Sequence, residues 1–409
     1  MTVTYVTWQR EASPLREVSR SLFGWRERRR QEQADNYRAS RLAMDFRAAC
    51  YGSGLTKDTA SCAGISGVSI PRVCSVVLGE TDCLLIQMTP GQLIEDYEKV
   101  APRIASAMRF PKVRFRLRSQ GYVWLELLTN DPLADLVPLP LRMRSITEPV
   151  LIGGLETGEQ LSLTLPGSGH VIVQGQSRSG KTRWIYGFLS QLAGCSDVRI
   201  TGSDSTTLIA RAFTGTRHDQ WASGTRDLEA HAELLESLVE EMDRRIEAMP
   251  LHLDVFPIDE ENPFTVVVIE ELAGLIVQAD AHQSGTGSKK TKLSDRIRGA
   301  YSRLMGESAK AGFAVVLIIQ RSDAGIVGGF ARSNAAFGIT FRVDEVSSIK
   351  MLHSQINEAL AIEHTYAPAG IALVSGPELP MARFRSPFMP SYQHFLELVA
   401  EQSAYSAAA

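Results

Sequence analysis

The sequence lacks several features that would assign it to a special class. Its longest apolar runs, such as 266–269 and 314–319, fall far short of the ~20 residues needed to cross a bilayer. No basic stretch followed by an apolar one opens the chain, so we expect no secretory signal. The cysteines are too far apart for a metal knuckle or a Cys-x-x-Cys motif; they are Cys50, Cys62, Cys74, Cys83 and Cys195. This odd, scattered set is typical of reduced thiols, some of them in the core, in a cytoplasmic protein.

An excess of charge of one sign is also absent. The 409 residues include 43 Lys and Arg against 46 Asp and Glu, a formal charge of -3, which excludes a uniformly basic nucleic-acid coat but not a basic groove. The charges are nevertheless segregated, with thirteen acids and three arginines in 219–261 and a lysine cluster at 289–292. A hydrophobic content of 44% is enough for two or three domains with their own cores.

Residues 1–64 are predicted to form a basic helical segment that ends in a linker. Residues 10–47 contain ten arginines and six acids, and their apolar spacing predicts two short amphipathic helices hinged around Phe23-Gly24-Trp25. The Gly-, Ser- and Thr-rich residues 51–64 are interpreted as the linker. The run Arg28-Arg29-Arg30 suits either an anionic surface or a solvated helix face, and the interspersed acids favour the second.

Residues 65–148 are predicted to form a small α+β module with a ββαββ order. Strands are expected at 73–78, 83–88, 112–118 and 122–128, and a helix is expected from Thr89-Pro90 to about Met108. Residues 112–118 alternate strictly, so that Arg114, Arg116 and Arg118 share one face. That face suits a polyanion, an exposed sheet surface or a protein interface.

The strongest chemical signal is a complete GxxxxGK[ST] motif between an apolar strand and a helical pattern. In this arrangement backbone N–H groups and a helix N-terminus cradle phosphate. Lys181 is expected to reach the β- and γ-phosphates, and the Thr182 hydroxyl to bind Mg²⁺. The predicted nucleotide-binding residues are Gly175, Gln176, Ser177, Arg178, Ser179, Gly180, Lys181 and Thr182.

Two later strands end in polar residues that suit nucleotide hydrolysis. The apolar run 264–269 leads into Glu270, a candidate for the Mg²⁺ shell, and Glu271, a candidate general base. The apolar run 314–319 leads into Gln320, which could sense the γ-phosphate or orient the attacking water. This order of strands is that of RecA-like motor cores, so residues 149–390 are predicted to be an α/β P-loop motor with a parallel central sheet, followed by a tail at 391–409.

These pieces together resemble the FtsK/SpoIIIE family of DNA-pumping ATPases, including the conjugal transfer (Tra) proteins of actinobacterial plasmids and integrative elements. Beyond the P-loop, the resemblance rests on Leu238–Met249, Val266–Leu275, Glu307–Arg321, Gly338–Val343 and Ala369–Pro387. It covers roughly 149–390. Two departures are Glu270, where the family commonly has Asp, and Ser322, where it usually has Pro.

The resemblance implies an ATP- and Mg²⁺-dependent hexameric ring that pumps double-stranded DNA, in conjugation, with membrane-associated partner proteins. It implies basic DNA-contacting loops, for which the candidates are Lys289, Lys290, Lys292 and Arg332. Ala309 stands where the family often has an arginine that acts on the neighbouring subunit, so either Lys310, Arg303 or Arg298 substitutes or the action on the neighbouring subunit is weak. The expected location is the cytoplasm, peripheral to a membrane through partners or the N-terminal segment.

Two other functions remain open from the sequence. One is a protein-export motor of the type VII secretion kind, which shares the core but usually strings several motor units on one chain. The other is a nucleotide-dependent switch or scaffold with little turnover. Two departures from the family pattern leave this function possible: Glu270 in place of aspartate, and Ala309 in place of arginine.

Overall fold

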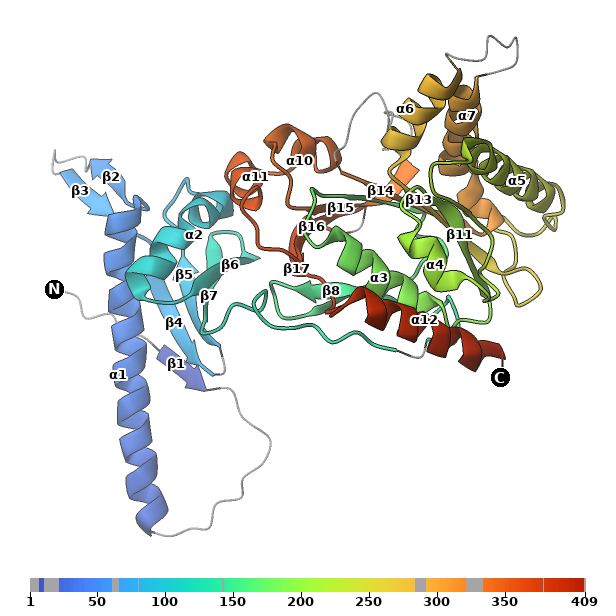
Figure 1. Cartoon of the computed structure of the whole chain (residues 1–409). Coiled ribbons are helices and arrows are strands. Elements are labelled where there is room, and N and C mark those ends of the chain that lie inside the picture. Colours follow the sequence, from blue (N-terminus) through green and yellow to red (C-terminus); the bar gives the residue numbers. More distant parts are fainter. Residues whose placement is uncertain are drawn as a thin grey trace. The chain divides into compact units, whose positions relative to one another are not determined.

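The computed structural model divides the chain into two compact units, Met1–Asp131 and Pro132–Ala409 (Figure 1). The residues described are 7–10, 22–60, 66–79, 81–141, 143–283, 292–320, 334–377 and 379–407. The division differs from the boundaries expected at 64/65 and 148/149. Helix α1 (Leu22–Ser53) packs into the first core, and Ile146 lies in the second, where its N–H donates to Asp197 Oδ1 at 2.9 Å.

The first unit contains the predicted ββαββ module. Its further elements are β1 (Thr7–Arg10), β2 (Lys57–Ala60), β3 (Ser66–Ser69), β4 (Arg72–Leu78), β5 (Asp82–Gln87), α2 (Ile94–Met108), β6 (Lys112–Ser119) and β7 (Tyr122–Leu128). The described strands form one sheet in the order β1-β4-β5-β7-β6, and a separate hairpin of β2 and β3. β1 pairs parallel with β4 and the other neighbours are antiparallel, so the ββαββ prediction is confirmed and one parallel strand is added to it.

From Leu22 onward the structure has one long helix, α1, where two short helices and the start of a linker were predicted. α1 runs without interruption to Ser53, so the expected hinge lies in its first turn and the expected linker is partly helix and partly β2. Gly24 costs little there, because the first turn of a helix has few backbone hydrogen bonds to lose. Leu42, Phe46 and Ala49 recur at helical spacing and are buried in the first core, which explains why the helix continues this far. Residues 11–21 lie outside the described residues.

Helix α2 begins later than predicted. Thr89 lies in a turn, where its N–H donates to the Gln92 side chain at 3.3 Å and its carbonyl accepts from the Gln92 N–H at 3.0 Å. The Asp96 carboxylate accepts the N–H of Leu93 at 3.0 Å, immediately before the first helical residue. The capped residue is therefore Leu93, four residues after Thr89, and the helix begins at Ile94.

The arginine-bearing face of β6 is held by neighbouring side chains of its own sheet. Arg114 Nε donates to Glu126 Oε2 at 2.7 Å, and Arg116 Nε lies 3.4 Å from Glu126 Oε1. Arg118 lies over the ring of Trp124, 5.4 Å from its centroid. Because Glu126 is buried, its carboxylate requires this cationic partnership. These contacts favour the interpretation of β6 as a sheet face with its own charge balance over that of a polyanion surface.

The second unit is a ten-stranded sheet with helices on both faces. Its strands in sheet order are β12 (Trp221–Ser223), β11 (Val198–Asp204), β13 (Phe264–Glu270), β14 (Phe313–Ile319), β10 (His170–Gln174), β15 (Ala335–Phe341), β16 (Ile371–Ser375), β17 (Ala382–Arg385), β8 (Val150–Leu155) and β9 (Gln160–Leu163). Neighbours from β12 to β15 pair parallel, and those from β15 to β9 pair antiparallel. The predicted α/β motor with a parallel centre is therefore confirmed, and the closing hairpin is β16–β17.

Helices cover both faces of this sheet, because successive apolar side chains along each buried strand point to opposite faces and each face must be covered. They are α3 (Lys181–Leu192), α4 (Leu208–Phe213), α5 (Leu228–Glu247), α6 (Leu272–Gln283), α7 (Leu293–Glu307), the 3₁₀ turn η1 (Ser308–Ala311), α10 (Val346–Leu352), α11 (Glu358–His364) and α12 (Tyr392–Ala407). Val266 and Val268 pack with α3, α4 and α12, whereas Val267 and Ile269 pack with α5, α6 and α7. Among the described helices, none is both long and apolar enough to span a bilayer.

The region expected to be a C-terminal tail is part of the motor core. α12 lies against α3 and α4 (Figure 1), and its Phe395 stacks on Tyr186 with ring centroids 4.3 Å apart. Tyr392 Oη donates to the carbonyl of Leu208 at 2.9 Å. The boundary at 390/391 therefore does not separate a tail from the fold.

A buried hydrogen-bond chain connects the strand before the P-loop to the closing hairpin. Gln174 Nε2 donates to Thr340 Oγ1 at 2.8 Å, and His353 Nε2 lies 2.8 Å from the same oxygen. His353 Nδ1 lies 2.7 Å from Ser375 Oγ, so the imidazole joins the two hydroxyl groups. Burial lowers the pKa of His353 to about 4, so the fold favours the neutral imidazole.

We expect the second unit to lose stability on acidification below about pH 6.5. Burial lowers the pKa to about 4 for His170, His218, His353 and His364. A pKa lower in the folded state means that the stabilisation is complete above the unfolded pKa of ~6.5 and is lost as the pH falls toward 4. Urea unfolding followed by tryptophan fluorescence between pH 7.5 and pH 4.5 measures this slope.

One substitution and one control test the assignment to buried histidines. His170 Nδ1 accepts the N–H of Val315 at 3.0 Å, so His170→Asn keeps an acceptor there but cannot titrate, and it should flatten the slope. His252→Asn at an exposed position should leave the slope unchanged. An unchanged slope in His170→Asn would contradict the assignment.

Candidate functional site

The P-loop is held between strands on both sides of β10. The N–H of Gly175 donates to the carbonyl of Ile319 at 3.3 Å, and the N–H of Gln176 donates to the carbonyl of Arg342 at 2.9 Å. Arg178 adopts a left-handed backbone conformation with φ 63°. The glycine-rich segment therefore turns from the end of β10 into α3 with its backbone shape set by β14 and by the residues after β15.

Gly180 closes this loop against the turn that precedes β16. Its φ is 107°, a left-handed conformation that favours glycine, and an added Cβ would lie 2.5 Å from the nitrogen of Gly370. The N–H of Gly370 also donates to the carbonyl of Ser179 at 2.9 Å. Glycine at 180 is thus required both by the backbone conformation and by this close approach.

Lys181 lies at the centre of the site, between β13 and β14. Its ammonium donates to the carbonyl of Ile319 at 2.8 Å and lies 3.4 Å from Glu271 Oε1. Burial lowers the pKa of Lys181, and the carboxylate of Glu271 counteracts part of that effect. The side chain is therefore held by two oxygen acceptors, which phosphate oxygens can replace.

Glu271 is positioned by a strained backbone. Its φ is 54°, in the left-handed region that a non-glycine residue rarely adopts. The N–H of Glu271 donates to the carbonyl of Ile318 at 2.9 Å, and its own carbonyl accepts from Leu275 in the first turn of α6. Strain of this kind, fixed by neighbouring hydrogen bonds, is typical of functional sites.

Glu270 lies in register with a second acidic residue, Asp204, at the end of β11. Thr206 Oγ1 joins the two carboxyl groups, 2.7 Å from Glu270 Oε2 and 2.8 Å from Asp204 Oδ1. Burial, and then the neighbouring Asp204, raises the pKa of Glu270 to about 8. Burial alone would raise the pKa of Asp204 too, but its hydrogen bonds lower the pKa of that carboxyl below the ordinary range.

One cavity of about 390 Å³ brings most of these side chains together. Its lining residues are Gln176, Ser177, Arg178, Gly180, Lys181, Thr182, Arg183, Thr206, Glu270, Glu271, Gln320 and Ala369. The predicted residues of the P-loop, the acidic strand end and Gln320 thus line one space, apart from Gly175 and Ser179.

The oxygen donors in this cavity fit Mg²⁺ bound together with a nucleotide. Mg²⁺ prefers hard oxygen ligands and commonly takes one or two from protein and the rest from phosphate and water. The exposed Thr182 hydroxyl and the Glu270 carboxyl group supply such oxygens. Within the described ranges no group of three or more His, Cys, Asp or Glu side chains is placed to hold a metal ion.

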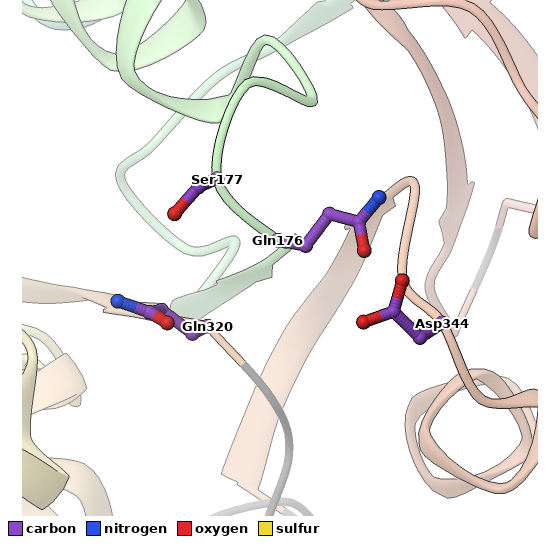
Figure 2. A pocket seen from close by; sticks show the side chains of 4 residues that line it. All are labelled: Gln176, Ser177, Gln320 and Asp344. Carbon is purple, nitrogen blue, oxygen red and sulfur yellow. The ribbon is translucent and has the colours of Figure 1, made fainter.

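A second cavity of about 280 Å³ lies beside the P-loop and is lined by Gln176, Ser177, Gln320 and Asp344 (Figure 2). Figure 2 shows the Gln176 side chain directed toward Asp344, with Gln320 at the opposite side. With its amide nitrogen facing the carboxylate, Gln176 donates to Asp344 Oδ2 at 3.1 Å and accepts from Arg342 Nε at 2.8 Å. Gln320 is exposed at the end of β14 and reaches both cavities.

The candidates for action on a neighbouring subunit have different surroundings. Arg303 donates to both Asp243 oxygens, at 2.7 and 2.9 Å, and to Glu307. Lys310 is exposed in η1, just before β14. Because β14 leads away from Lys310 toward Gln320 over seven residues, roughly 23 Å at 3.3 Å each, Lys310 lies at the sheet edge opposite its own cavity.

Of the candidate DNA-contacting residues, Lys292 is exposed immediately before α7. Lys289, Lys290 and Arg332 lie outside the described residues.

Sequence reasoning missed several residues of the site, of which Asp204 and Thr206 are the most important. β11 ends in an acid just as β13 does, and this signal was present in the sequence. That β11 and β13 are neighbours, which puts Asp204 beside Glu270, depends on the strand order and cannot be seen in the spacing. The contacts of Asp344 and Gly370 with the P-loop likewise depend on the fold.

The fold and the cavity define the class of protein. A mostly parallel sheet with a GxxxxGK[ST] loop on one central strand and an acidic strand end two strands away has the architecture of P-loop ATPases. No protein-family model matches the chain.

Comparisons with known proteins bear out the resemblance to the FtsK/SpoIIIE family. The chain is 23% identical over 300 residues to the DNA translocase FtsK of Mycobacterium leprae, across 66% of this chain and 34% of that protein. Among solved structures, the conjugation coupling protein TcpA of pCW3, in its monomer form with ATPγS, has a TM-score of 0.55 at 18% identity and covers 88% of this chain and 99% of that one. ATPases 2 and 3 of EssC from Geobacillus thermodenitrificans give 0.50 at 13% identity, over 67% of this chain and 51% of that one.

These likenesses differ in what they establish. The structural ones lie below 20% identity and establish the fold. The chain spans about a third of the length of that FtsK, 34%, so the activity and partners of the whole protein do not transfer with the match.

We expect Gly180→Ala to impair nucleotide binding. The added Cβ would lie 2.5 Å from the Gly370 nitrogen at a residue with φ 107°, so the P-loop must shift. Strain of ~1–3 kcal/mol corresponds to a loss of about 5- to 150-fold in nucleotide affinity, measurable by titration with a fluorescent ATP analogue.

Gly299→Ala provides the control. Gly299 lies within α7 with open space around its Cα, so alanine should stabilise the fold by about 0.5–1 kcal/mol and leave affinity unchanged. Wild-type affinity in Gly180→Ala would contradict the proposed constraint.

Proposed function

We propose that this protein is an ATP-dependent double-stranded DNA translocase that acts in conjugative transfer of plasmid or integrative-element DNA. The observation that carries the proposal is the single cavity that holds Lys181, Thr182, Glu270, Glu271 and Gln320. The likeness to FtsK and to the coupling protein TcpA supports DNA as the substrate.

The residues have distinct roles in this proposal. The P-loop N–H groups and Lys181 bind the phosphates, and Thr182 and Glu270 hold the metal, which supplies charge neutralisation at the phosphates when bound. Lys181 leaves Glu271 for phosphate oxygens, which frees the Glu271 carboxylate to accept a proton from the attacking water. Gln320 orients that water or contacts the γ-phosphate.

The assembly we propose is a hexameric ring around the DNA. Lys310 supplies the cation that acts on the neighbouring site, since it lies at the sheet edge away from its own cavity. Arg303 is the weaker candidate because two carboxylates already hold it. Lys292, with Lys289, Lys290 and Arg332, contacts DNA phosphates without sequence preference.

A protein-export motor is the second candidate function. It is favoured by the likeness to ATPases 2 and 3 of EssC, one of several type VII ATPase neighbours of this fold.

Glu271→Gln should abolish turnover but not binding. The amide keeps the shape of the side chain but cannot accept the proton, so ATP hydrolysis should fall about 10²–10⁴-fold, as for other losses of a general base. A phosphate-release assay and a nucleotide titration measure the two effects separately. Glu261→Gln, at an exposed position before β13, should hydrolyse ATP at the wild-type rate. Turnover that survives in Glu271→Gln would remove this residue from the mechanism.

Duplex DNA should stimulate ATP hydrolysis regardless of its sequence. Phosphate contacts are sequence-independent and weaken as salt rises, so stimulation by two unrelated duplexes should be equal at 50 mM salt and much smaller at 300 mM. The measurement is the hydrolysis rate with and without each duplex, with nucleotide affinity determined in parallel. No stimulation at either salt concentration, with nucleotide binding intact, would contradict DNA translocation and favour the export motor or the switch.

A further inference from the structure

The turn that follows β11 brings a hydroxyl group to the acidic end of β13. Thr206 Oγ1 lies 2.7 Å from Glu270 Oε2 and 2.8 Å from Asp204 Oδ1, and the Thr206 side chain lines the nucleotide cavity. Thr206 is close to Glu270 because β11 and β13 are neighbours in the sheet, with Asp204 in register with Glu270. No motif of the sequence includes Thr206.

The position of this hydroxyl is fixed by its own backbone. The fully buried carboxylate of Asp204 accepts four backbone N–H groups at 2.8–3.0 Å, two from the turn (Thr206 and Thr207) and two from the start of α4 (Ile209 and Ala210). Thr207 adopts a left-handed conformation with φ 68°, which tightens the turn further. Little conformational freedom is left to lose when the Thr206 hydroxyl engages a neighbour.

The balance of donors and acceptors directs this hydroxyl to Glu270. A threonine hydroxyl carries one proton, so it donates to one acceptor at a time. Asp204 already accepts four backbone donors, whereas an ionised Glu270, the form that binds a metal, gains a donor from Thr206. One carboxylate oxygen of Glu270, Oε2, is then held by Thr206, on a side chain that lines the nucleotide cavity beside Asp204.

We propose that Thr206, itself held by Asp204, is a positioning residue that fixes the Glu270 carboxylate for the magnesium ion of bound nucleotide. The inference rests on the proposed nucleotide-dependent function. The glutamate carboxylate at this strand end reaches the turn that follows the neighbouring strand, and the hydroxyl there restricts its movement.

The test compares the affinity of the full chain for N-methylanthraniloyl-ATP in Mg²⁺ and in EDTA, for wild type and three variants. Thr206→Val removes the hydroxyl but keeps the branched shape, Thr206→Ser keeps the hydroxyl, and Ser205→Ala removes a different hydroxyl from the same turn. In Thr206→Val the ratio of affinity in Mg²⁺ to affinity in EDTA should be about tenfold smaller than in wild type, because one hydrogen bond to a charged group is lost. The affinity in EDTA should be unchanged. Thr206→Ser and Ser205→Ala should stay within about twofold of wild type. Thermal unfolding confirms that each variant is folded, and Thr206→Ala replaces Thr206→Val if the valine variant is not.

Several results would overturn the inference. They are a full magnesium-dependent gain in Thr206→Val, an equal loss in Thr206→Ser, a loss of EDTA affinity that matches the loss in Mg²⁺, or no gain in the wild type. Failure of the proposed function is separate: a wild type that binds nucleotide with a magnesium-dependent gain but hydrolyses no ATP, or responds to no DNA, leaves the binding comparison interpretable.

Discussion

The buried ammonium group of Lys181 is the interaction around which the second unit is arranged. Charge of this kind is costly to bury unless acceptors surround it. Here the acceptors are the Ile319 carbonyl, at the end of β14, and the Glu271 carboxylate, just after β13. β13 and β14 must therefore end at the same level as β10, and the parallel register of these three strands provides that alignment.

The same register explains why polar residues gather at one edge of an otherwise apolar sheet. Each of β10, β11, β13 and β14 is almost entirely buried along its length, and a polar residue ends the strand or directly follows it. The apolar parts pack helices on both faces, and the ends are left to bind a ligand. The antiparallel strands beyond β15 contribute differently, through the close approach of Gly370 to Gly180.

The motifs that depend on local pattern could be predicted from the sequence, and contacts between distant segments could not. The P-loop, the acidic strand end and Gln320 were predicted because each combines an apolar run with particular polar residues at its end. The start of α2 was predicted too early, because Thr89-Pro90 resembles a helix start while the cap comes from Asp96. The place of α12 in the core and the pairing of Asp204 with Glu270 depend on strand order and helix packing, which no local pattern encodes.

The left-handed backbone of Glu271 affects which amino-acid substitutions are favoured at this position during evolution. Glycine adopts that conformation without strain, so a chain selected for folding stability alone would favour glycine at position 271. Glycine there would also remove the carboxylate beside Lys181. At position 271, folding stability therefore favours glycine, whereas the proposed hydrolysis requires glutamate. A search for stabilised variants that ignores activity would tend to replace the glutamate.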